Sequence, residues 1–140
     1  MKTISFDIGG VIDANPKVCR EVILELKKEG YRIIIVTAIS DNPIMYGPYA
    51  EGRRWFSIGR LYSFGLRRKI DYDECLTVLN PDNGKKTGYM KDGVLRTHGV
   101  SVHVDDNEEV MSNIKYCPCV KFDPGMDIKT LIRAIEDLEG

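Results

Sequence analysis

The chain has 140 residues, 43% of them hydrophobic, which is enough to form one compact domain with its own core. Lys and Arg number 20 and Asp and Glu number 21, so no global charge favours nucleic acid or an anionic membrane. No apolar run approaches the roughly 18 residues of a membrane helix, and the first residues lack the apolar core of a signal peptide. We therefore expect a single domain over 1–140, cytoplasmic and without a membrane contact.

Five short apolar runs rich in β-branched residues predict strands, and the amphipathic stretches between them predict helices. The runs are TISFDI (3–8), RIIIVTA (32–38), CLTVL (75–79), VSVHVD (100–105) and CVKFD (119–123). Asn15 can cap the first helix and Gly30 can end it, while Asn107 and Asp127 can cap the last two. We expect a loop over Ser40–Pro48. This alternation predicts an α/β, Rossmann-like three-layer sandwich with a five-stranded, mostly parallel sheet and helices on both faces.

Oxygen-bearing side chains stand at the ends of three predicted strands: Asp7 after the first, Thr37 after the second, and the pair Asp105 and Asp106 after the fourth. Because the carboxyl ends of parallel strands share one edge of the sheet, we expect these side chains to meet there. Each of them alone could simply cap a turn or a helix. Together they predict a Mg²⁺ site, because clustered carboxylates need a cation and hard cations prefer oxygen ligands.

These residues resemble the motifs of the haloacid dehalogenase (HAD) superfamily of phosphohydrolases. The first motif of that family, an apolar strand ending Asp-x-Asp-Gly, is matched by FDIGGVI except at Gly9. The second, an apolar strand ending in Ser or Thr, is matched by RIIIVTA with Thr37. The fourth, an apolar strand ending in an acidic pair, is matched by VSVHVDDNEE. The resemblance covers essentially the whole chain.

The third motif of the family is a lysine on the helix before the fourth strand, where this sequence offers three. We choose Lys91, because its Lys-x-x-x-Leu pattern is similar to that of nucleotidase-like and polynucleotide-phosphatase-like members. Lys86 is the second choice and Lys85 the third. Only a few residues separate Asp13 from the first helix, so the resemblance implies a HAD-like fold with no large cap and an open site.

The resemblance implies a Mg²⁺-dependent phosphohydrolase, a hydrolase of the phosphatase type. Asp7 would attack phosphorus and become an aspartyl phosphate, and Mg²⁺ would offset the developing charge. Thr37 would hold phosphate oxygens, and Lys91 would neutralise the nucleophile and the phosphate. The implied metal site consists of Asp7, the backbone carbonyl of Gly9, Asp105 and Asp106.

Gly9 stands where the family usually places an aspartate that protonates the leaving oxygen and then activates water, a contribution of roughly 10²- to 10⁴-fold. Three interpretations stay open. The favoured one is a phosphatase that tolerates the loss through a good leaving group, a water relay or another carboxylate such as Asp13. The second is a protein that binds phosphate, or is itself phosphorylated, with little turnover. The least favoured is a dehalogenase, whose reaction at Asp7 would not need Mg²⁺.

The segment Arg53–Lys69 is basic and aromatic and contains no acidic residue. Its arginines are Arg53, Arg54, Arg60, Arg67 and Arg68. The favoured interpretation is an amphipathic helix that turns Trp55, Ile58 and Tyr62 toward the core and its arginines outward. The alternative is a surface for nucleic acid, where bases stack on aromatic rings and arginines bind phosphates. The substrate would then be a phosphorylated small molecule or nucleotide, or a nucleic acid end.

Two further features carry no function in this interpretation. The four cysteines, Cys19, Cys75, Cys117 and Cys119, lack the spacing of a zinc site, so we expect buried, reduced thiols. His103 alternates with the apolar residues of the fourth predicted strand, so we expect a packed strand residue rather than a catalytic base.

Overall fold

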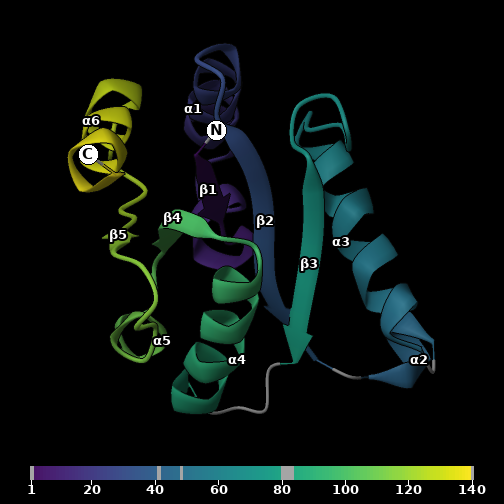
Figure 1. The fold of residues 1–140 in the computed structure, drawn as a ribbon. Coiled ribbons are helices and arrows are strands. Elements are labelled where there is room, and N and C mark those ends of the chain that lie inside the picture. The colour runs from purple at the N-terminus through teal and green to yellow at the C-terminus, as the bar shows by residue number, and fades with distance from the viewer. Residues whose placement is uncertain (1, 41, 48, 80–83, 140) are drawn as a thin grey trace.

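The computed structural model describes residues 2–40, 42–47, 49–79 and 84–139. Its centre is a five-stranded sheet in the order β3-β2-β1-β4-β5, in which every neighbouring pair is parallel (Figure 1). The strands are β1 (Thr3–Phe6), β2 (Arg32–Ile39), β3 (Glu74–Leu79), β4 (Val100–Asp105) and β5 (Cys119–Lys121). The predicted sheet and fold class are confirmed.

Helices cover both faces of this sheet (Figure 1). They are α1 (Pro16–Lys28), α2 (Pro43–Tyr46), α3 (Ala50–Ser63), α4 (Gly84–Thr97), α5 (Glu108–Ser112) and α6 (Ile128–Glu139). Buried residues of α1 and α6 form one core with β1, β4 and β5, to which Leu61 of α3 also belongs. Those of α4 and α5 form a second core against Ile34 and Val36 of β2. None of the described helices is long and apolar enough to cross a membrane.

The three predicted helix caps form as expected. Asn15 Oδ1 accepts a hydrogen bond from the backbone N–H of Val18 at 3.3 Å, and Asn107 Oδ1 accepts from Val110 at 3.0 Å. Asp127 Oδ1 accepts from Thr130 at 2.7 Å. Each cap satisfies an N–H group that the first helical turn leaves without a partner, so the local sequence fixes where these helices begin.

Two boundaries differ from the sequence-based expectation. The segment Ser40–Pro48 contains the short helix α2, which Asn42 caps through the N–H of Ile44 at 3.0 Å. Its residues 41 and 48 lie outside the described residues. Strand β2 also continues one residue past the predicted run 32–38, to Ile39, because it pairs with β3 from Ile34 to Ile39.

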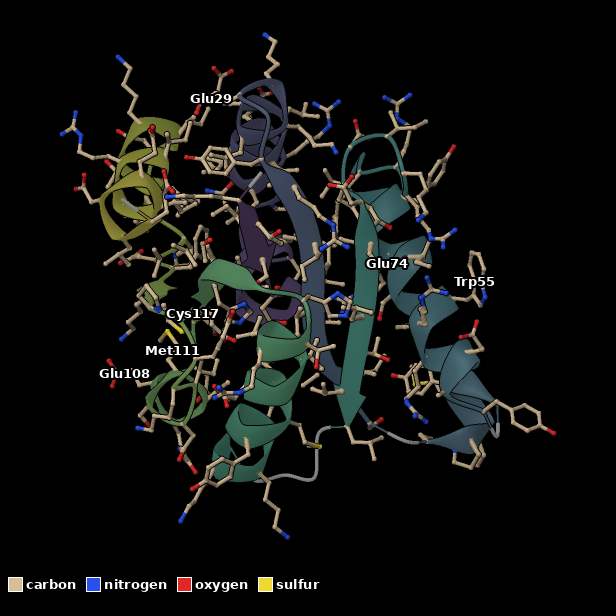
Figure 2. The ribbon with its side chains drawn as sticks, viewed as in Figure 1. Glu29, Trp55, Glu74, Glu108, Met111 and Cys117 are labelled. Atoms are coloured by element: carbon tan, nitrogen blue, oxygen red, sulfur yellow. The ribbon has the colours of Figure 1, made fainter. Side chains whose placement is uncertain are left out.

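The aromatic face of α3 is a second correction. Trp55 is 53% exposed and Tyr62 71% exposed, so these side chains do not face the core, and Figure 2 shows Trp55 on the outer side of the helix. Ser57 and Leu61 are buried instead, and Ile58 packs at the edge of the core. The prediction was therefore wrong for Trp55 and Tyr62 and right for Ile58, because the buried side of α3 is centred on Ser57 and Leu61.

Between β1 and α1 the chain makes only the wide turn η1 (Ile8–Ile12), which leaves no space for an inserted cap. Gly10 has φ +74°, and a Cβ at this residue would lie 2.0 Å from Oδ2 of Asp106. Gly9 has φ −65° and open space around the position of a Cβ. The backbone therefore requires glycine at position 10 but not at position 9.

This difference predicts opposite effects for two alanine substitutions. Gly10→Ala should lower the free energy of unfolding by about 1–3 kcal/mol, because it forces a side chain into the left-handed region. Gly9→Ala should leave stability unchanged or raise it by up to about 1 kcal/mol, because alanine restricts only the unfolded chain. Urea denaturation of both variants tests the pair, and equal losses would show that the turn does not distinguish the two positions.

Candidate active site

Asp7 follows β1 directly and lies at the carboxyl edge of the sheet. Its backbone N–H donates to the carbonyl of Val104 at 3.0 Å, which ties it to the neighbouring strand β4. Its Oδ1 accepts from the N–H of Ile8 at 2.8 Å, and its Oδ2 lies 3.1 Å from Lys91 Nζ. The carboxylate is thus held in a fixed orientation on a mostly buried residue.

Lys91 extends from α4 into the centre of this edge. Its side chain is 1% exposed, and Nζ lies 2.8 Å from Oδ2 of Asp105 as well as 3.1 Å from Asp7. The two carboxylates outweigh the cost of burying the ammonium and raise the pKa of Lys91, so it stays charged. Of the three candidate lysines, Lys85 and Lys86 lie on the exposed side of the helix, and Lys91 is the one that reaches Asp7.

Asp105 accepts four hydrogen bonds. Oδ2 accepts from Lys91 at 2.8 Å and from His103 Nε2 at 2.9 Å, and Oδ1 accepts from the N–H groups of Asp106 at 2.8 Å and Asn107 at 3.2 Å. Burial opposes its charge, but His103 and Lys91 hold the pKa of Asp105 well below its ordinary value. A carboxylate offers about four acceptor positions, so the protein itself fills those of Asp105.

Asp7, Asp105 and Asp106 present carboxylate oxygens within 4.8 Å of one another. Burial and the neighbouring charges of Asp105 and Asp7 raise the pKa of Asp106. Burial also raises the pKa of Asp7, although Lys91 and the Thr37 hydroxyl act in the opposite direction. Three carboxylates and one ammonium leave two negative charges, which suits one divalent cation with oxygen ligands. Asp7 and Asp106 are the better placed ligands, because Asp105 is already saturated.

A cavity of about 350 Å³ opens over this cluster. It is lined by Asp7, Gly9, Ala38, Gly84, Thr87, Lys91, Asp105, Asp106, Asn107 and Val110. Thr87 stands one helical turn before Lys91, and its buried hydroxyl has no hydrogen-bond partner in the described part of the chain. An unpartnered buried hydroxyl beside an ammonium is suited to an oxyanion ligand.

The structure brings the predicted residues Asp7, Lys91, Asp105 and Asp106 together and places Gly9 on the cavity wall. Thr37 is buried within β2, and its hydroxyl lowers the pKa of Asp7, but Ala38 rather than Thr37 lines the cavity. The catalytic and metal-binding roles of these residues stay predictions.

Asp13, the carboxylate considered as a substitute at position 9, has other partners. Its Oδ1 accepts from the N–H of Gly10 at 2.7 Å, and its Oδ2 pairs with Arg60 at 2.9 Å. Asp13 does not line the cavity. The turn therefore uses this carboxylate to hold its own backbone.

Two buried polar residues lie behind the site; the sequence predicted that His103 is packed in its strand but gave no indication of Ser5. His103 and Ser5 are both fully buried, and Ser5 Oγ lies 2.7 Å from His103 Nδ1. Burial lowers the pKa of His103, so the ring is neutral. The alternation of β4 indicated only that His103 faces away from its apolar neighbours. No sequence signal showed that it reaches Asp105.

The basic segment is neutralised in part by the chain's own acids. The pairs are Arg54 with Glu74, Arg60 with Asp13, Arg67 with Asp71, and Arg68 and Lys69 with Glu74. The guanidinium carbon of Arg68 also lies 5.5 Å from the centre of the exposed Trp55 ring. The positive surface is thus smaller than the sequence indicates, and a nucleic acid partner stays a prediction.

The cysteines were expected to be buried, reduced thiols, and the structure agrees in part. All four are free thiols, and Cys19 and Cys75 are buried, whereas Cys117 and Cys119 are half-buried. Burial raises the pKa of Cys19 and of Cys75 to about 12, so these thiols are unreactive.

Comparison with known proteins supports the fold. Searches of protein-family models and of curated proteins find no match. Among solved structures, the chain is similar to D,D-heptose 1,7-bisphosphate phosphatase from B. bronchiseptica in complex with magnesium and phosphate. The TM-score is 0.54 and the identity 16%, over 84% of this chain and 79% of that chain. This similarity confirms the predicted fold.

The ion pairs of Lys91 predict a stability effect. Lys91→Met should lower the free energy of unfolding by roughly 3–5 kcal/mol at neutral pH, because it leaves two buried carboxylates without their cation. The loss should shrink as the pH falls toward 5. Lys91 lowers the pKa of both carboxylates, so its removal raises their folded-state pKa, and their protonation at lower pH then stabilises the folded variant.

Urea denaturation of Lys91→Met at several pH values measures both effects. Lys85→Met is the matched control, because Lys85 is exposed on the same helix. If the two variants lose similar stability, Lys91 does not hold the carboxylates together.

Proposed function

We propose that this protein is a Mg²⁺-dependent phosphomonoesterase that acts through an aspartyl phosphate at Asp7. The observation that carries the proposal is the buried Lys91 ammonium between Asp7 and Asp105, on the wall of a cavity that retains two negative charges. The similar solved structure is that of a phosphatase with magnesium and phosphate bound. The shared fold makes the same class of reaction a reasonable proposal here.

In the first step, an Asp7 carboxylate oxygen attacks phosphorus and the bond from phosphorus to the leaving oxygen breaks. The leaving oxygen takes up a proton from solvent water, and a second water then hydrolyses the aspartyl phosphate, which releases inorganic phosphate and restores Asp7. Mg²⁺, held by Asp7, Asp106 and the carbonyl of Gly9, would offset the charge of the phosphate oxygens. Lys91 stays protonated and neutralises the nucleophile and the transferred group.

The donors on the cavity wall would hold the phosphate. Lys91 would contribute a charged donor, and the phosphate would give the Thr87 hydroxyl the partner that it lacks among the described residues. Thr37, whose hydroxyl lowers the pKa of Asp7, would orient that carboxylate. The substrate class that we propose is a phosphorylated small molecule or a nucleotide, with a nucleic acid end as the larger alternative. The open site, without a cap after η1, accommodates either.

A second candidate function is a phospho-accepting or phosphate-binding protein with little turnover. Gly9 provides no acid–base carboxylate, and Asp13 is held by Gly10 and Arg60 and does not line the cavity. Formation of the aspartyl phosphate with a good leaving group needs no proton donor, whereas its hydrolysis needs an activated water. The same residues would then trap a phosphoryl group at Asp7.

Hydrolysis of an activated aryl phosphate, with and without Mg²⁺, tests the proposal. Asp7→Asn should reduce activity to background, because the amide cannot act as the nucleophile. Gly9→Asp should raise the rate of wild type by roughly 10²- to 10⁴-fold, because position 9 has space for the side chain and the aspartate supplies the acid–base group.

Gly9→Asn is the matched control for Gly9→Asp, since it has the same size and no acid. A wild type that is inert but traps beryllium fluoride at Asp7 supports the phospho-accepting protein. If wild type neither hydrolyses nor traps the analogue, and Gly9→Asp adds nothing, the proposal is wrong.

The Thr87 hydroxyl gives a separate prediction. Thr87→Val should weaken competitive inhibition by inorganic phosphate about tenfold, because the lost hydrogen bond goes to a charged ligand. Thr87→Ser retains the hydroxyl and should behave like wild type. Inhibition constants that are the same for both variants would show that phosphate does not contact this residue.

A further inference from the structure

A chain of buried polar groups runs behind the proposed site. Ser5 of β1 and His103 of β4 are neighbours in the register of the sheet, and both are fully buried. Ser5 Oγ lies 2.7 Å from His103 Nδ1, and His103 Nε2 lies 2.9 Å from Oδ2 of Asp105. Side chains two residues apart on a strand share a face, so β4 itself directs His103 toward Asp105.

The partners of His103 determine the direction of these hydrogen bonds. The ionised carboxylate of Asp105 can only accept, so Nε2 carries the proton and donates to it. Nδ1 of the neutral ring then accepts from the hydroxyl of Ser5. Ser5 therefore holds the ring in the one tautomer that donates to Asp105.

The donation from His103 restricts the position of Asp105. Oδ2 accepts from His103 and Lys91, and Oδ1 accepts from the backbone N–H groups of residues 106 and 107. Without His103, Oδ2 would have Lys91 as its only donor, and the carboxylate could turn toward the ammonium. Lys91 would then move away from Asp7, which is 3.1 Å from Nζ.

We propose that His103, held by Ser5, is a positioning residue that fixes Asp105 and thereby keeps the Lys91 ammonium on Asp7. The proposal rests on the phosphohydrolase function proposed above. Neither Ser5 nor His103 lines the cavity over Asp7, so neither touches the substrate. Apolar residues at these two buried strand positions would avoid the cost of desolvating two polar groups, and the linkage to Asp105 explains why polar residues stand there.

Kinetics with the aryl phosphate test the positioning role. His103→Leu removes the donor and should lower kcat by about 10- to 100-fold, with KM changed less than twofold. His103→Gln keeps an N–H group near the position of Nε2 and should recover most of kcat. Ser5→Ala should fall between these variants, because it frees the ring without removing it.

Val102→Ala is the matched control for lost stability. Val102 is buried in the same strand, next to His103 but on the opposite face, and belongs to the core that α1 and α6 form. This variant should lose stability and keep kcat. If Val102→Ala lowers kcat as much as His103→Leu, or if Gln recovers nothing, the effect is a general loss of packing and the proposal is wrong.

Crystal structures of the metal-free variants separate this proposal from the proposed function. In His103→Leu the distance from Lys91 Nζ to Asp7 Oδ2 should exceed about 4 Å, which is too long for a hydrogen bond. In His103→Gln this distance should stay close to its wild-type value. This readout requires no turnover. A Leu variant in which Lys91 still contacts both carboxylates would overturn the positioning role even if the enzyme is active.

Discussion

The ion pairs of one lysine determine the arrangement of the site. Lys91 Nζ lies 3.1 Å from Asp7 and 2.8 Å from Asp105, at 1% exposure. Two buried carboxylates this close would repel strongly, and each alone would carry a large desolvation cost. The ammonium lets β1 and β4 bring their acidic ends together. The third carboxylate, Asp106, then adds the charge that makes the cluster attractive to a divalent cation.

The topology of the sheet explains why the cluster forms between β1 and β4. From β1 the chain builds outward to β2 and β3 on one side, and then returns to place β4 and β5 on the other. The strand order therefore reverses between β1 and β4, and their connections leave in opposite directions. This leaves a crevice at their carboxyl ends, into which α4 directs Lys91 and Thr87. The topology of the sheet thus determines where the crevice forms, and the residues at the strand ends provide its charged groups.

Much of this arrangement could be predicted from local patterns. Strand runs, caps and strand-end carboxylates are short-range signals, and the choice of Lys91 depends on its local Lys-x-x-x-Leu pattern. The local patterns gave wrong or incomplete predictions where the position of a side chain depends on contacts between residues far apart in the sequence. Periodicity grouped Trp55 with Tyr62 but could not show which side of α3 the sheet covers. The role of His103 depends on Ser5, 98 residues away, and on the ring geometry at Asp105.

The two adjacent glycines of η1 differ in what the backbone requires of them. Gly10 is required, because its φ is +74° and Asp106 occupies the space of a side chain. Gly9 is not, because its φ is −65° and nothing lies within 4 Å of the position of a Cβ. The fold would accept the acid–base aspartate that HAD phosphatases usually carry at this position. If Asp7 is the nucleophile, the residues that favour formation of an aspartyl phosphate are in place, while the group that speeds its hydrolysis is missing for no steric reason. The lifetime of phosphorylated Asp7 then depends on how water reaches it through the open side of the cavity.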